Sequence, residues 1–353
     1  MEKYNKYQKI DSLKQKKRWQ PNNQHNMSHK FYKLRPWVDK SKLNFASMSL
    51  NTSPGACALM MENLHSLIYV HWEYISENPN FIPLLECNLE HVVWARLSAN
   101  PGAISILKRH PEKIVWHYLS ANPSALSILE RNLDKIDWSM LSKNPAAISL
   151  IEPNLDKVDW HYLSGNPAAI SILESNLDKV DWHYLSENPA AIHLLEAHPH
   201  KIHWTCLSMN RAEGAIPLLE RNINKVNWSL LSANPSAIGL LEKHPDKIVW
   251  YHLSANPAAM SILERNLDKI SWCNFCYNPN AVMMLDPQIK GLKWHRDKIN
   301  WYSLSANANI FTYDYEAMKT NFYDNSYGRE LTEKMWHPTN MAKWEGWGFG
   351  EEE

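Results

Sequence analysis

Glycine is scarce in this sequence, with 10 residues in 353, whereas tryptophan occurs 17 times. The chain has no glycine-rich phosphate-binding loop, no G-x-S-x-G nucleophile elbow and no H-E-x-x-H zinc motif, so the common catalytic signatures are missing. A composition this poor in glycine and rich in tryptophan is unusual for an ordinary mixed domain and indicates a repeated unit.

Cysteine, charge of one sign and long apolar runs are also limited. The five cysteines are an odd number and the first twenty residues contain no apolar signal core, so we expect a reduced, intracellular protein without a disulfide framework. Basic and acidic residues number 37 each, so net charge identifies no partner. No apolar run approaches the roughly 18 residues that span a bilayer, and we expect no membrane partner.

Ten tryptophans divide the middle of the chain into units of nearly constant length. Successive tryptophans are 22 residues apart, except for one interval of 24. Degenerate units lie around Phe45 and from Trp301, as expected at the ends of a stack. We expect the indoles to form the repeat core; they are Trp72, Trp94, Trp116, Trp138, Trp160, Trp182, Trp204, Trp228, Trp250 and Trp272.

Each unit has the sequence pattern of a small helical hairpin. Asn188 is a candidate N-cap, Pro189 suits the first helical position, where its missing N–H costs nothing, and apolar residues follow at helical spacing. A second helix is expected to open at Asp178 and to run through Trp182. Because its apolar residues lie on more than one side, this helix needs a neighbouring unit on each face.

We therefore predict an all-α fold: a right-handed α-solenoid of about eleven 22-residue hairpins over residues 43–311, on the order of 100 Å long. A leucine-rich-repeat-like horseshoe is the alternative, because the period fits that family and Val180 to Trp182 could imitate its strand. Leucine stands three residues after the tryptophan, where that family needs Asn or Cys, and this favours the helical fold.

The two ends differ from the array. Residues 1–42 hold 12 basic and three acidic residues, giving +9, so the rest of the chain carries −9. We expect a disordered basic arm, in which Lys14 to Arg18 is a candidate nuclear-targeting or phosphate-contacting patch. Residues 312–353 are expected to cap the last repeat, with a helix over 329–336, an aromatic end and an acidic tail.

Two short motifs have metal-ligand spacing, but the repeat explains both. His198, His200 and His203 form H-x-H-x-x-H, yet His198 takes the place of the histidine in the other His-Pro turns. Cys273 and Cys276 form a lone C-x-x-C in which Cys276 replaces the repeat serine. We therefore expect no metal site and no cofactor.

A glutamate recurs 14 residues after most of the ten tryptophans and a lysine 19 residues after most of them, as in Glu174 and Lys179. A catalytic site is a single asymmetric arrangement, so a pair repeated in most units argues against catalysis. We interpret the two series as weak electrostatic contacts between successive helices, and we expect no catalytic residue and no enzymatic activity.

The positions that vary between units are the candidate binding surface. The two residues after each tryptophan are rich in tyrosine and histidine, and aromatic and arginine side chains often dominate protein interfaces. The alternative is that these rings pack between adjacent hairpins. We name this set the aromatic stripe: Tyr74, Arg96, His117, Tyr118, His161, Tyr162, His183, Tyr184, Tyr251 and His252. A second candidate edge lies 15 residues after the tryptophan: Arg109, Arg131, Arg221, Lys243 and Arg265.

The units LSENPAAIHLLE, NLDKVDW and WHYLSGNP resemble short repeats in uncharacterised proteins encoded by giant DNA viruses of algae and amoebae. The likeness covers about residues 45–311, and MWHPTNMAKWEGWGF resembles a C-terminal element of such proteins. The resemblance implies a viral origin and a repeat fold, and it supplies no catalytic residue.

These observations predict a non-catalytic protein-binding scaffold, in the host cytoplasm, or in the nucleus if Lys14 to Arg18 acts as a targeting signal. The resemblance adds a structural or minor component of the virion as an alternative. A nucleic-acid-binding repeat is the third reading, but the −9 body would repel phosphates. Any such binding is expected to be weak and to depend on residues 1–42.

Overall fold

The computed structural model describes residues 31–63, 70–286 and 296–324. The chain divides into two compact units, one of residues 33–313 and one that combines residues 1–32 with residues 314–353. The repeats lie in the first unit, and the second contains α25 (Tyr315–Asp324). Among the described helices, none combines the length and the apolar character needed to cross a membrane.

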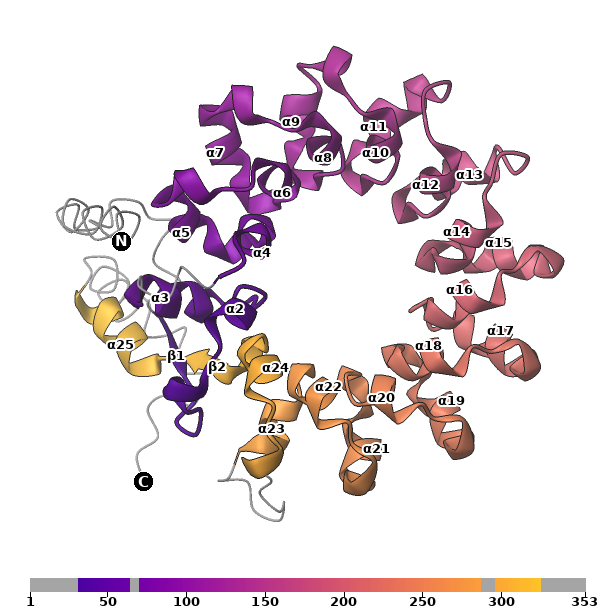
Figure 1. Ribbon diagram of the computed structural model, residues 1–353. Helices are drawn as coiled ribbons and strands as arrows, with labels where there is room; N and C mark the ends of the chain where they lie inside the picture. The colour runs from indigo at the N-terminus through magenta and orange to yellow at the C-terminus, as the bar shows by residue number, and fades with distance from the viewer. Residues whose placement is uncertain (1–30, 64–69, 287–295, 325–353) are drawn as a thin grey trace, which may run out of the picture. The chain divides into compact units, whose positions relative to one another are not determined.

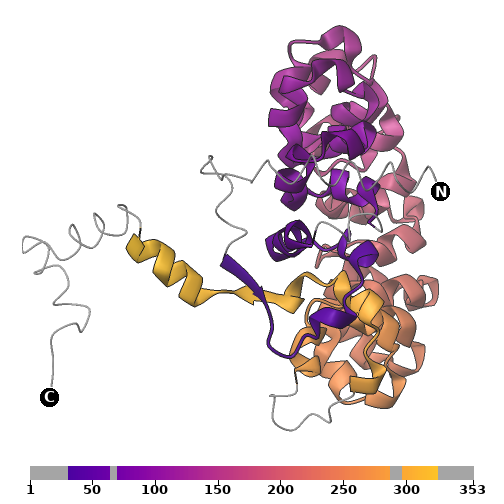
Figure 2. The same ribbon diagram turned by 60° about the vertical axis from the view of Figure 1, so that its left-hand side comes forward.

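The described part of residues 33–313 contains twelve repeats, and each repeat begins with a short α-helix. Figure 1 shows these first helices side by side along the inner rim of a ring, which Figure 2 shows turned by 60°, and we name them the inner helices. They are α2 (Phe45–Met48), α4 (Trp72–Glu77), α6 (Trp94–Ala99), α8 (Trp116–Ser120), α10 (Trp138–Ser142), α12 (Trp160–Ser164), α14 (Trp182–Glu187), α16 (Trp204–Met209), α18 (Trp228–Ala233), α20 (Trp250–Leu253), α22 (Trp272–Tyr277) and α24 (Trp301–Ser305).

A second helix in each of the first eleven repeats lies on the outer rim (Figure 1). These outer helices are α3 (Pro54–Glu62), α5 (Ile82–Glu86), α7 (Ile104–Arg109), α9 (Leu126–Leu129), α11 (Ile148–Ile151), α13 (Ile170–Glu174), α15 (Ile192–Ala197), α17 (Ala215–Arg221), α19 (Ile238–Lys243), α21 (Met260–Glu264) and α23 (Ala281–Leu285). The prediction of an all-α repeat fold is confirmed.

The Asn-Pro pair opens the outer segment as a 3₁₀ turn that continues into the outer helix. In the repeat of α12, the Oδ1 of Asn166 accepts a hydrogen bond from the N–H of Ala168 at 3.0 Å, and Pro167 takes the first position. Turns of this kind are η5 (Pro79–Phe81), η7 (Pro101–Ala103), η9 (Pro123–Ala125), η11 (Pro145–Ala147), η13 (Pro167–Ala169), η14 (Pro189–Ala191), η17 (Pro235–Ala237), η19 (Pro257–Ala259) and, without proline, η22 (Ala308–Ile310).

The inner helix begins later than predicted. The expected start at Asp178 is wrong, because the backbone at Asp181 is extended and α14 starts only at Trp182. Val180 is 8% exposed and packs into the core, and Asp181 caps the helix by accepting from the N–H groups of His183 and Tyr184. Most other repeats have a separate 3₁₀ turn before this break: η6 (Leu89–His91), η8 (Pro111–Lys113), η10 (Leu133–Lys135), η15 (Pro199–Lys201), η16 (Ile223–Lys225), η18 (Pro245–Lys247), η20 (Leu267–Lys269) and η21 (Arg296–Lys298). A further 3₁₀ turn, η12 (Glu152–Asn154), continues α11 directly.

The core of each repeat consists of aliphatic side chains between its inner and outer helices. Leu163, Ala169 and Leu173 have no exposed surface, and Ile172 is 6% exposed. The tryptophans predicted to form the repeat core are less buried than these aliphatic side chains. The half-buried indoles are Trp72, Trp94, Trp116, Trp138, Trp160, Trp182, Trp204, Trp228, Trp250 and Trp272.

The leucine-rich-repeat alternative fails because the repeats form no sheet. In the described residues the one sheet has two strands, β1 (Tyr32–Leu34) and β2 (Phe311–Tyr313), and both lie outside the repeats. The extended residue before eleven of the twelve described inner helices donates to a serine of a neighbouring repeat instead of to a strand. The N–H of Asp181, for example, donates to the Oγ of Ser164 at 2.9 Å.

Buried asparagine side chains connect every repeat to the one before it. The Nδ2 of Asn188 donates to the backbone oxygens of Ser164 and Asn166, at 3.0 and 3.1 Å. The same kind of bond recurs through all twelve described repeats, and we name this set the asparagine ladder. Its members are Asn51, Asn78, Asn100, Asn122, Asn144, Asn166, Asn188, Asn210, Asn234, Asn256, Asn278 and Asn307.

The asparagine ladder closes on itself. The Nδ2 of Asn51 in the first repeat donates to the backbone oxygens of Ser305 and Asn307 in the last repeat, both at 2.9 Å. The N–H of Asn44 donates to the Oγ of Ser305 at 2.8 Å, so α2 lies beside α24 (Figure 1). The predicted open array of about eleven hairpins is therefore corrected to a closed ring of twelve described repeats.

Part of the predicted N-terminal arm belongs to the folded structure. Within residues 33–42, the N–H of Arg35 donates to the backbone oxygen of Ile310 at 2.9 Å, and η3 (Lys40–Lys42) precedes the first repeat. The boundary predicted at residue 42 is thus too late by several residues. The predicted patch from Lys14 to Arg18 and the predicted helix over 329–336 lie outside the described residues.

Candidate binding surface along the inner helices

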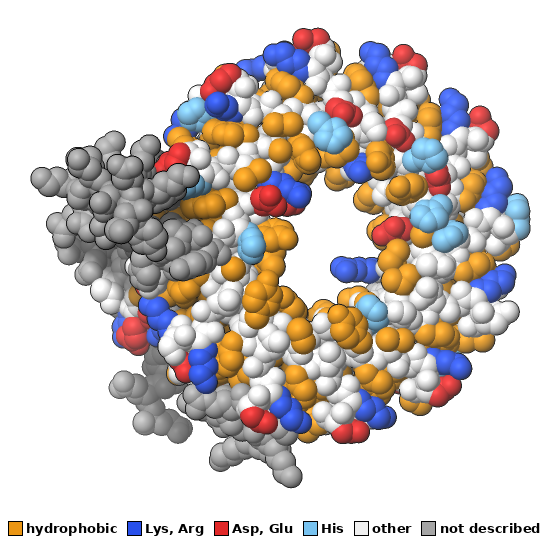
Figure 3. All heavy atoms as spheres, viewed as in Figure 1, with side chains coloured by type: hydrophobic (Ala, Val, Ile, Leu, Met, Phe, Trp, Pro, Cys, Tyr) orange, Lys and Arg blue, Asp and Glu red, His pale blue; other side chains and the backbone are white. Residues whose placement is uncertain are grey.

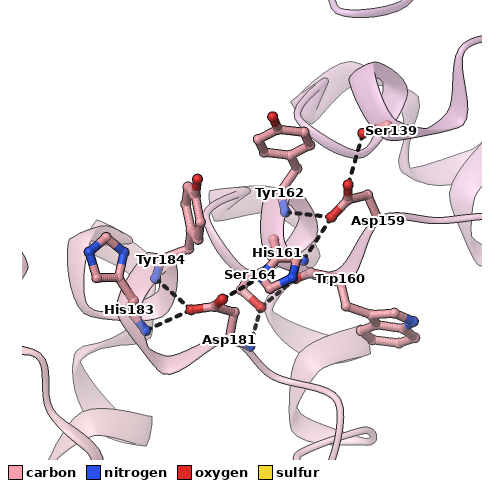
Figure 4. Close-up of polar contacts among 9 residues, drawn as sticks. All are labelled: Ser139, Asp159, Trp160, His161, Tyr162, Ser164, Asp181, His183 and Tyr184. Atoms are coloured by element: carbon pink, nitrogen blue, oxygen red, sulfur yellow. Dashed lines mark hydrogen bonds and ion pairs between the residues drawn. The ribbon is translucent and has the colours of Figure 1, made fainter.

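The aromatic stripe lies on the inner helices, and most of its side chains are exposed. Tyr251 is 60% exposed, Tyr74 42% and Tyr184 37%. Arg96 and the first histidine of each His-Tyr pair are exposed as well, whereas Tyr118, Tyr162 and His252 are half-buried. Every repeat that contributes residues to the stripe therefore presents at least part of them to solvent. In Figure 4 the rings of Tyr162 and Tyr184 point in the same direction, away from the indole of Trp160.

Aspartates between the repeats hold the stripe in place. Asp159 accepts from the N–H groups of His161 and Tyr162, at 3.0 and 3.3 Å, so it caps the helix that carries these rings. The other oxygen of Asp159 accepts from the Ser139 hydroxyl at 2.8 Å, which links it to the preceding repeat (Figure 4). These caps fix the backbone under the rings of α12 and α14, whereas α4, α6, α8 and α20, which carry other residues of the stripe, begin without a side-chain cap.

Histidine and aspartate pair across successive repeats. His161 Nδ1 contacts Asp181 Oδ2, and His117 Nδ1 lies 2.8 Å from Asp137 Oδ2. The hydrogen bond with Asp181 and its negative charge raise the pKa of His161. Burial acts to raise the pKa of Asp181, but the bond to His161 and the N–H groups of Tyr184 and His183 outweigh it and lower that pKa.

The alternative reading of the stripe, packing between hairpins, holds for part of it. The rings of Tyr162 and Tyr184 meet edge to face across adjacent repeats, with centroids 6.0 Å apart. The Nζ of Lys143 lies 3.7 Å from the centroid of Tyr162, and Arg96 pairs with Glu77 at 3.4 Å. Stripe rings of successive repeats thus support each other at α12 and α14, and the stripe keeps one side open to solvent.

The second candidate edge lies on the outer helices and is largely paired. Arg109 contacts Glu86 at 2.5 Å, Lys243 contacts Glu220 at 2.5 Å, and Arg265 contacts Glu242 at 2.7 Å. Figure 3 shows acidic and basic side chains next to each other around this outer edge. These pairs are exposed, so they contribute little free energy and leave little unbalanced charge for a partner.

The recurrent lysine does not pair with the recurrent glutamate, contrary to the expectation. The Nζ of Lys179 lies over the indole of Trp160 in its own repeat, 4.8 Å from the ring centroid. The lysine stem covers the exposed side of the half-buried ring, which is a cation–π contact. The same contact joins Lys135 to Trp116, Lys157 to Trp138, Lys201 to Trp182, Lys225 to Trp204, Lys269 to Trp250 and Lys298 to Trp272.

The two metal-like motifs are not assembled as their spacing suggests. His198 contacts the backbone oxygen of Leu194 through Nδ1 and packs on Trp182, which is the role of a turn residue. Cys276 is fully buried in the serine position, where burial raises the pKa of its thiol to about 11. Cys273 is exposed and contacts the hydroxyl of Ser303 at 3.3 Å.

Sequence reasoning missed one cluster, which joins His183 of the stripe to His203 and Cys206 of the next repeat. The sulfur of Cys206 lies 3.1 Å from Nδ1 of His203 and 3.3 Å from Nε2 of His183. A signal was present, because His203 stands where the two preceding repeats have the capping residues Asp159 and Asp181.

The stripe supplies ring edges, hydroxyl groups and imidazoles on a fixed backbone, which suits recognition of another molecule better than bond chemistry. Comparisons of the chain with protein-family models, with curated proteins and with solved structures return no match.

Proposed function

We propose that this protein is a non-catalytic scaffold that binds a protein partner along the aromatic stripe. The observation that carries the proposal is the stripe itself, a row of exposed tyrosine and histidine rings on the inner helices of a closed repeat array. Tyrosine presents a large contact area at a low cost in conformational entropy, and a polar tip for hydrogen bonds.

Preorganisation supports this proposal. Tyr162 and Tyr184 support each other, and the caps at Asp159 and Asp181 fix the backbone beneath them. A partner would therefore order few groups on this surface, and most of the contact free energy would appear as affinity.

The charges within the stripe favour a protein over a nucleic acid. Asp137, Asp159 and Asp181 lie between the rings of successive repeats, where they accept hydrogen bonds from backbone N–H groups or from histidine. A phosphate backbone laid along the stripe would meet these carboxylates. A polypeptide can donate hydrogen bonds to these carboxylates from its own N–H and O–H groups.

Site-specific photo-crosslinking tests the proposal. A photoreactive phenylalanine analogue replaces Tyr184 in the stripe or, as the matched control, Leu133, which is 52% exposed in the turn after an outer helix. We expect one discrete protein adduct from position 184 and none from position 133. The adduct should disappear when Tyr162→Ala and Tyr251→Ala are introduced into the same chain.

Equal labelling from both positions, labelling of RNA, or no adduct at 184 would overturn the proposal. Location and stoichiometry distinguish the virion alternative from a scaffold. A virion component would be found in purified virus particles at a fixed stoichiometry, and its Tyr162→Ala variant would be packaged as well as the wild type. A scaffold requires that the same substitution release the partner.

A further inference from the structure

Three side chains with metal-binding atoms meet where α14 packs beside α16, the inner helix of the next repeat. The ligand atoms of His183, His203 and Cys206 all lie within 4.8 Å of one another. In the described parts of the chain this is the one group of three histidine, cysteine or acidic residues so placed. The group joins two successive repeats, because His183 follows Trp182 and the other two residues flank Trp204.

The spacing of the three atoms suits a tetrahedral ion. A zinc ion with bonds of about 2.0 Å to nitrogen and about 2.3 Å to sulfur separates those ligand atoms by about 3.5 Å. The two nitrogen-to-sulfur distances here are 3.3 Å for His183 and 3.1 Å for His203. Both imidazoles are exposed and all three ligand atoms lie within 4.8 Å of one another, so rotation of the rings can adjust the nitrogens around an ion, while Cys206, 3% exposed, is anchored in α16.

The surroundings of the three side chains favour a cation, and metal binding breaks only a weak hydrogen bond. Burial raises the pKa of the Cys206 thiol and the negative charges of Glu187 and Asp181 raise it further, so a bound cation would offset the cost of a thiolate here. The Nδ1 of His203 also accepts from the N–H of Cys206, but that contact is long, at 3.4 Å, so ligation replaces a weak hydrogen bond. Two imidazoles and one thiolate are a donor set that zinc prefers, and magnesium and calcium do not.

The cluster is a local departure from the repeat that the fold itself does not require. At the two equivalent junctions His117 meets Asp137 and His161 meets Asp181, so each imidazole has a carboxylate partner. At this junction His183 meets His203 instead. An aspartate at 203 would cap the helix equally well, so capping does not explain the histidine.

We propose that His183, His203 and Cys206 bind one zinc ion or a similar divalent transition-metal ion, with the fourth coordination position open. The open position leaves room for water or for one further donor atom, as in zinc sites with three protein ligands. This proposal stands on the three side chains alone and does not depend on partner binding by the aromatic stripe.

Cobalt(II) titration of the full-length, metal-free chain tests the site, because cobalt reports a bound thiolate by its charge-transfer absorption and tetrahedral geometry by its visible bands. We expect one cobalt ion per chain with both signatures, displaced by zinc. In Cys206→Ser the thiolate absorption should be lost. In His183→Asn zinc should bind at least about tenfold more weakly, since even outer-shell partners contribute ten- to a hundredfold.

Two control variants each remove a thiol or an imidazole that lies outside the cluster. Cys273→Ser removes an exposed cysteine outside the cluster, and His117→Asn removes an exposed histidine from the same position of another repeat. Both should keep wild-type cobalt spectra and zinc affinity. Because His183 is exposed, His183→Asn should retain the wild-type circular dichroism, so its loss of zinc cannot be ascribed to misfolding. An unchanged thiolate band in Cys206→Ser, or the absence of any such band in the wild type, would overturn the proposal.

Discussion

At the residue scale, each repeat relies on its leucine more than on its tryptophan. Leu163 has no exposed surface, whereas the indole of Trp160 is half-buried and covered on its open side by Lys179. The tryptophan that marks each repeat in the sequence is therefore less buried than the leucine that follows it. The tryptophan joins the aliphatic core to the charged surface, and its lysine shields it from water.

Alanine substitutions should show this difference. Leu163→Ala is expected to lower the free energy of unfolding by about 3–5 kcal/mol, as for other fully buried leucines. Trp160→Ala should cost about 1–3 kcal/mol, because part of the indole stays in contact with solvent and the cation–π contact contributes only about 0.5–1 kcal/mol. Urea unfolding followed by circular dichroism measures both, and a larger loss for Trp160→Ala than for Leu163→Ala would contradict the assignment of the core.

The pair of His161 and Asp181 predicts a pH effect of definite sign. Because the pKa of His161 is raised in the folded chain, its contribution to stability is fully present below the unfolded value near 6.5 and is lost as pH rises through the higher folded value. The pKa of Asp181 is lowered in the folded chain, so its contribution to stability is fully present above the ordinary carboxyl value of 3.8 and is lost as pH falls through the lower folded value.

NMR titration of His161 in metal-free buffer tests this linkage. Asp181→Asn removes the charge that holds the proton on the imidazole, so the pKa of His161 should fall toward 6.5. Glu174→Gln, which removes the partner of His193 on an outer helix, should leave the titration of His161 unchanged. A His161 pKa that is the same in Asp181→Asn as in the wild type would show that the two side chains do not interact in solution.

At the scale of the element, asparagine holds successive helices in register. Asn166 is 1% exposed; its Nδ2 donates to the backbone oxygen of Ser142, and its Oδ1 accepts from the N–H of Ala168. One amide therefore caps its own outer segment and bonds to the previous inner helix. Aspartate cannot do both, because a carboxylate has no donor for the oxygen of Ser142.

Asn166→Asp should thus destabilise the array although it keeps the shape of the side chain. We expect a loss of about 2–4 kcal/mol, since a buried charge would face a carbonyl oxygen without a hydrogen bond. The control is Ser175→Ala in the exposed turn after α13, which should change stability by less than about 0.5 kcal/mol. Equal effects of the two substitutions on urea unfolding would refute the role given to the asparagine ladder.

At the scale of the whole ring of repeats, in residues 33–313, closure of the ring gives every described repeat a neighbour on both sides. All junctions between repeats are then equivalent. In an open array the junction of a terminal repeat attaches one repeat only, so breaking it costs less than breaking a central junction. Here the first and last described repeats share a junction, in which Asn51 bonds to Ser305 and Asn307 as the other ladder asparagines bond to their neighbours.

Asn51→Asp should therefore destabilise the chain as much as Asn166→Asp does, to within about 0.5 kcal/mol, the usual error of comparing independent sites. Parallel urea unfolding of the two variants measures the difference. A much smaller loss for Asn51→Asp would mean that the first and last repeats are not joined in solution and that the array is open.

Several features could be predicted from sequence because they are local. The period of 22, the Asn-Pro cap of the outer segment and the helical spacing of Ile192 and Leu195 all follow from rules that act within a few residues. The stripe positions were identified for the same reason, since a repeated helix exposes the same positions in every unit. The start of the inner helix was misplaced because the extended residues before it are stabilised by the serine of the preceding repeat.

The sequence by itself determined that short helices repeat, where each outer segment is capped and which positions vary. Only the tertiary structure decided that the array closes, because closing twelve repeats requires a turn of about 30° at each junction and small packing differences at every junction add up along the array. It also decided that His183 reaches Cys206 in the next repeat. A contact between repeats depends on how two helices pack side by side, and that geometry is set by side chains distant in sequence.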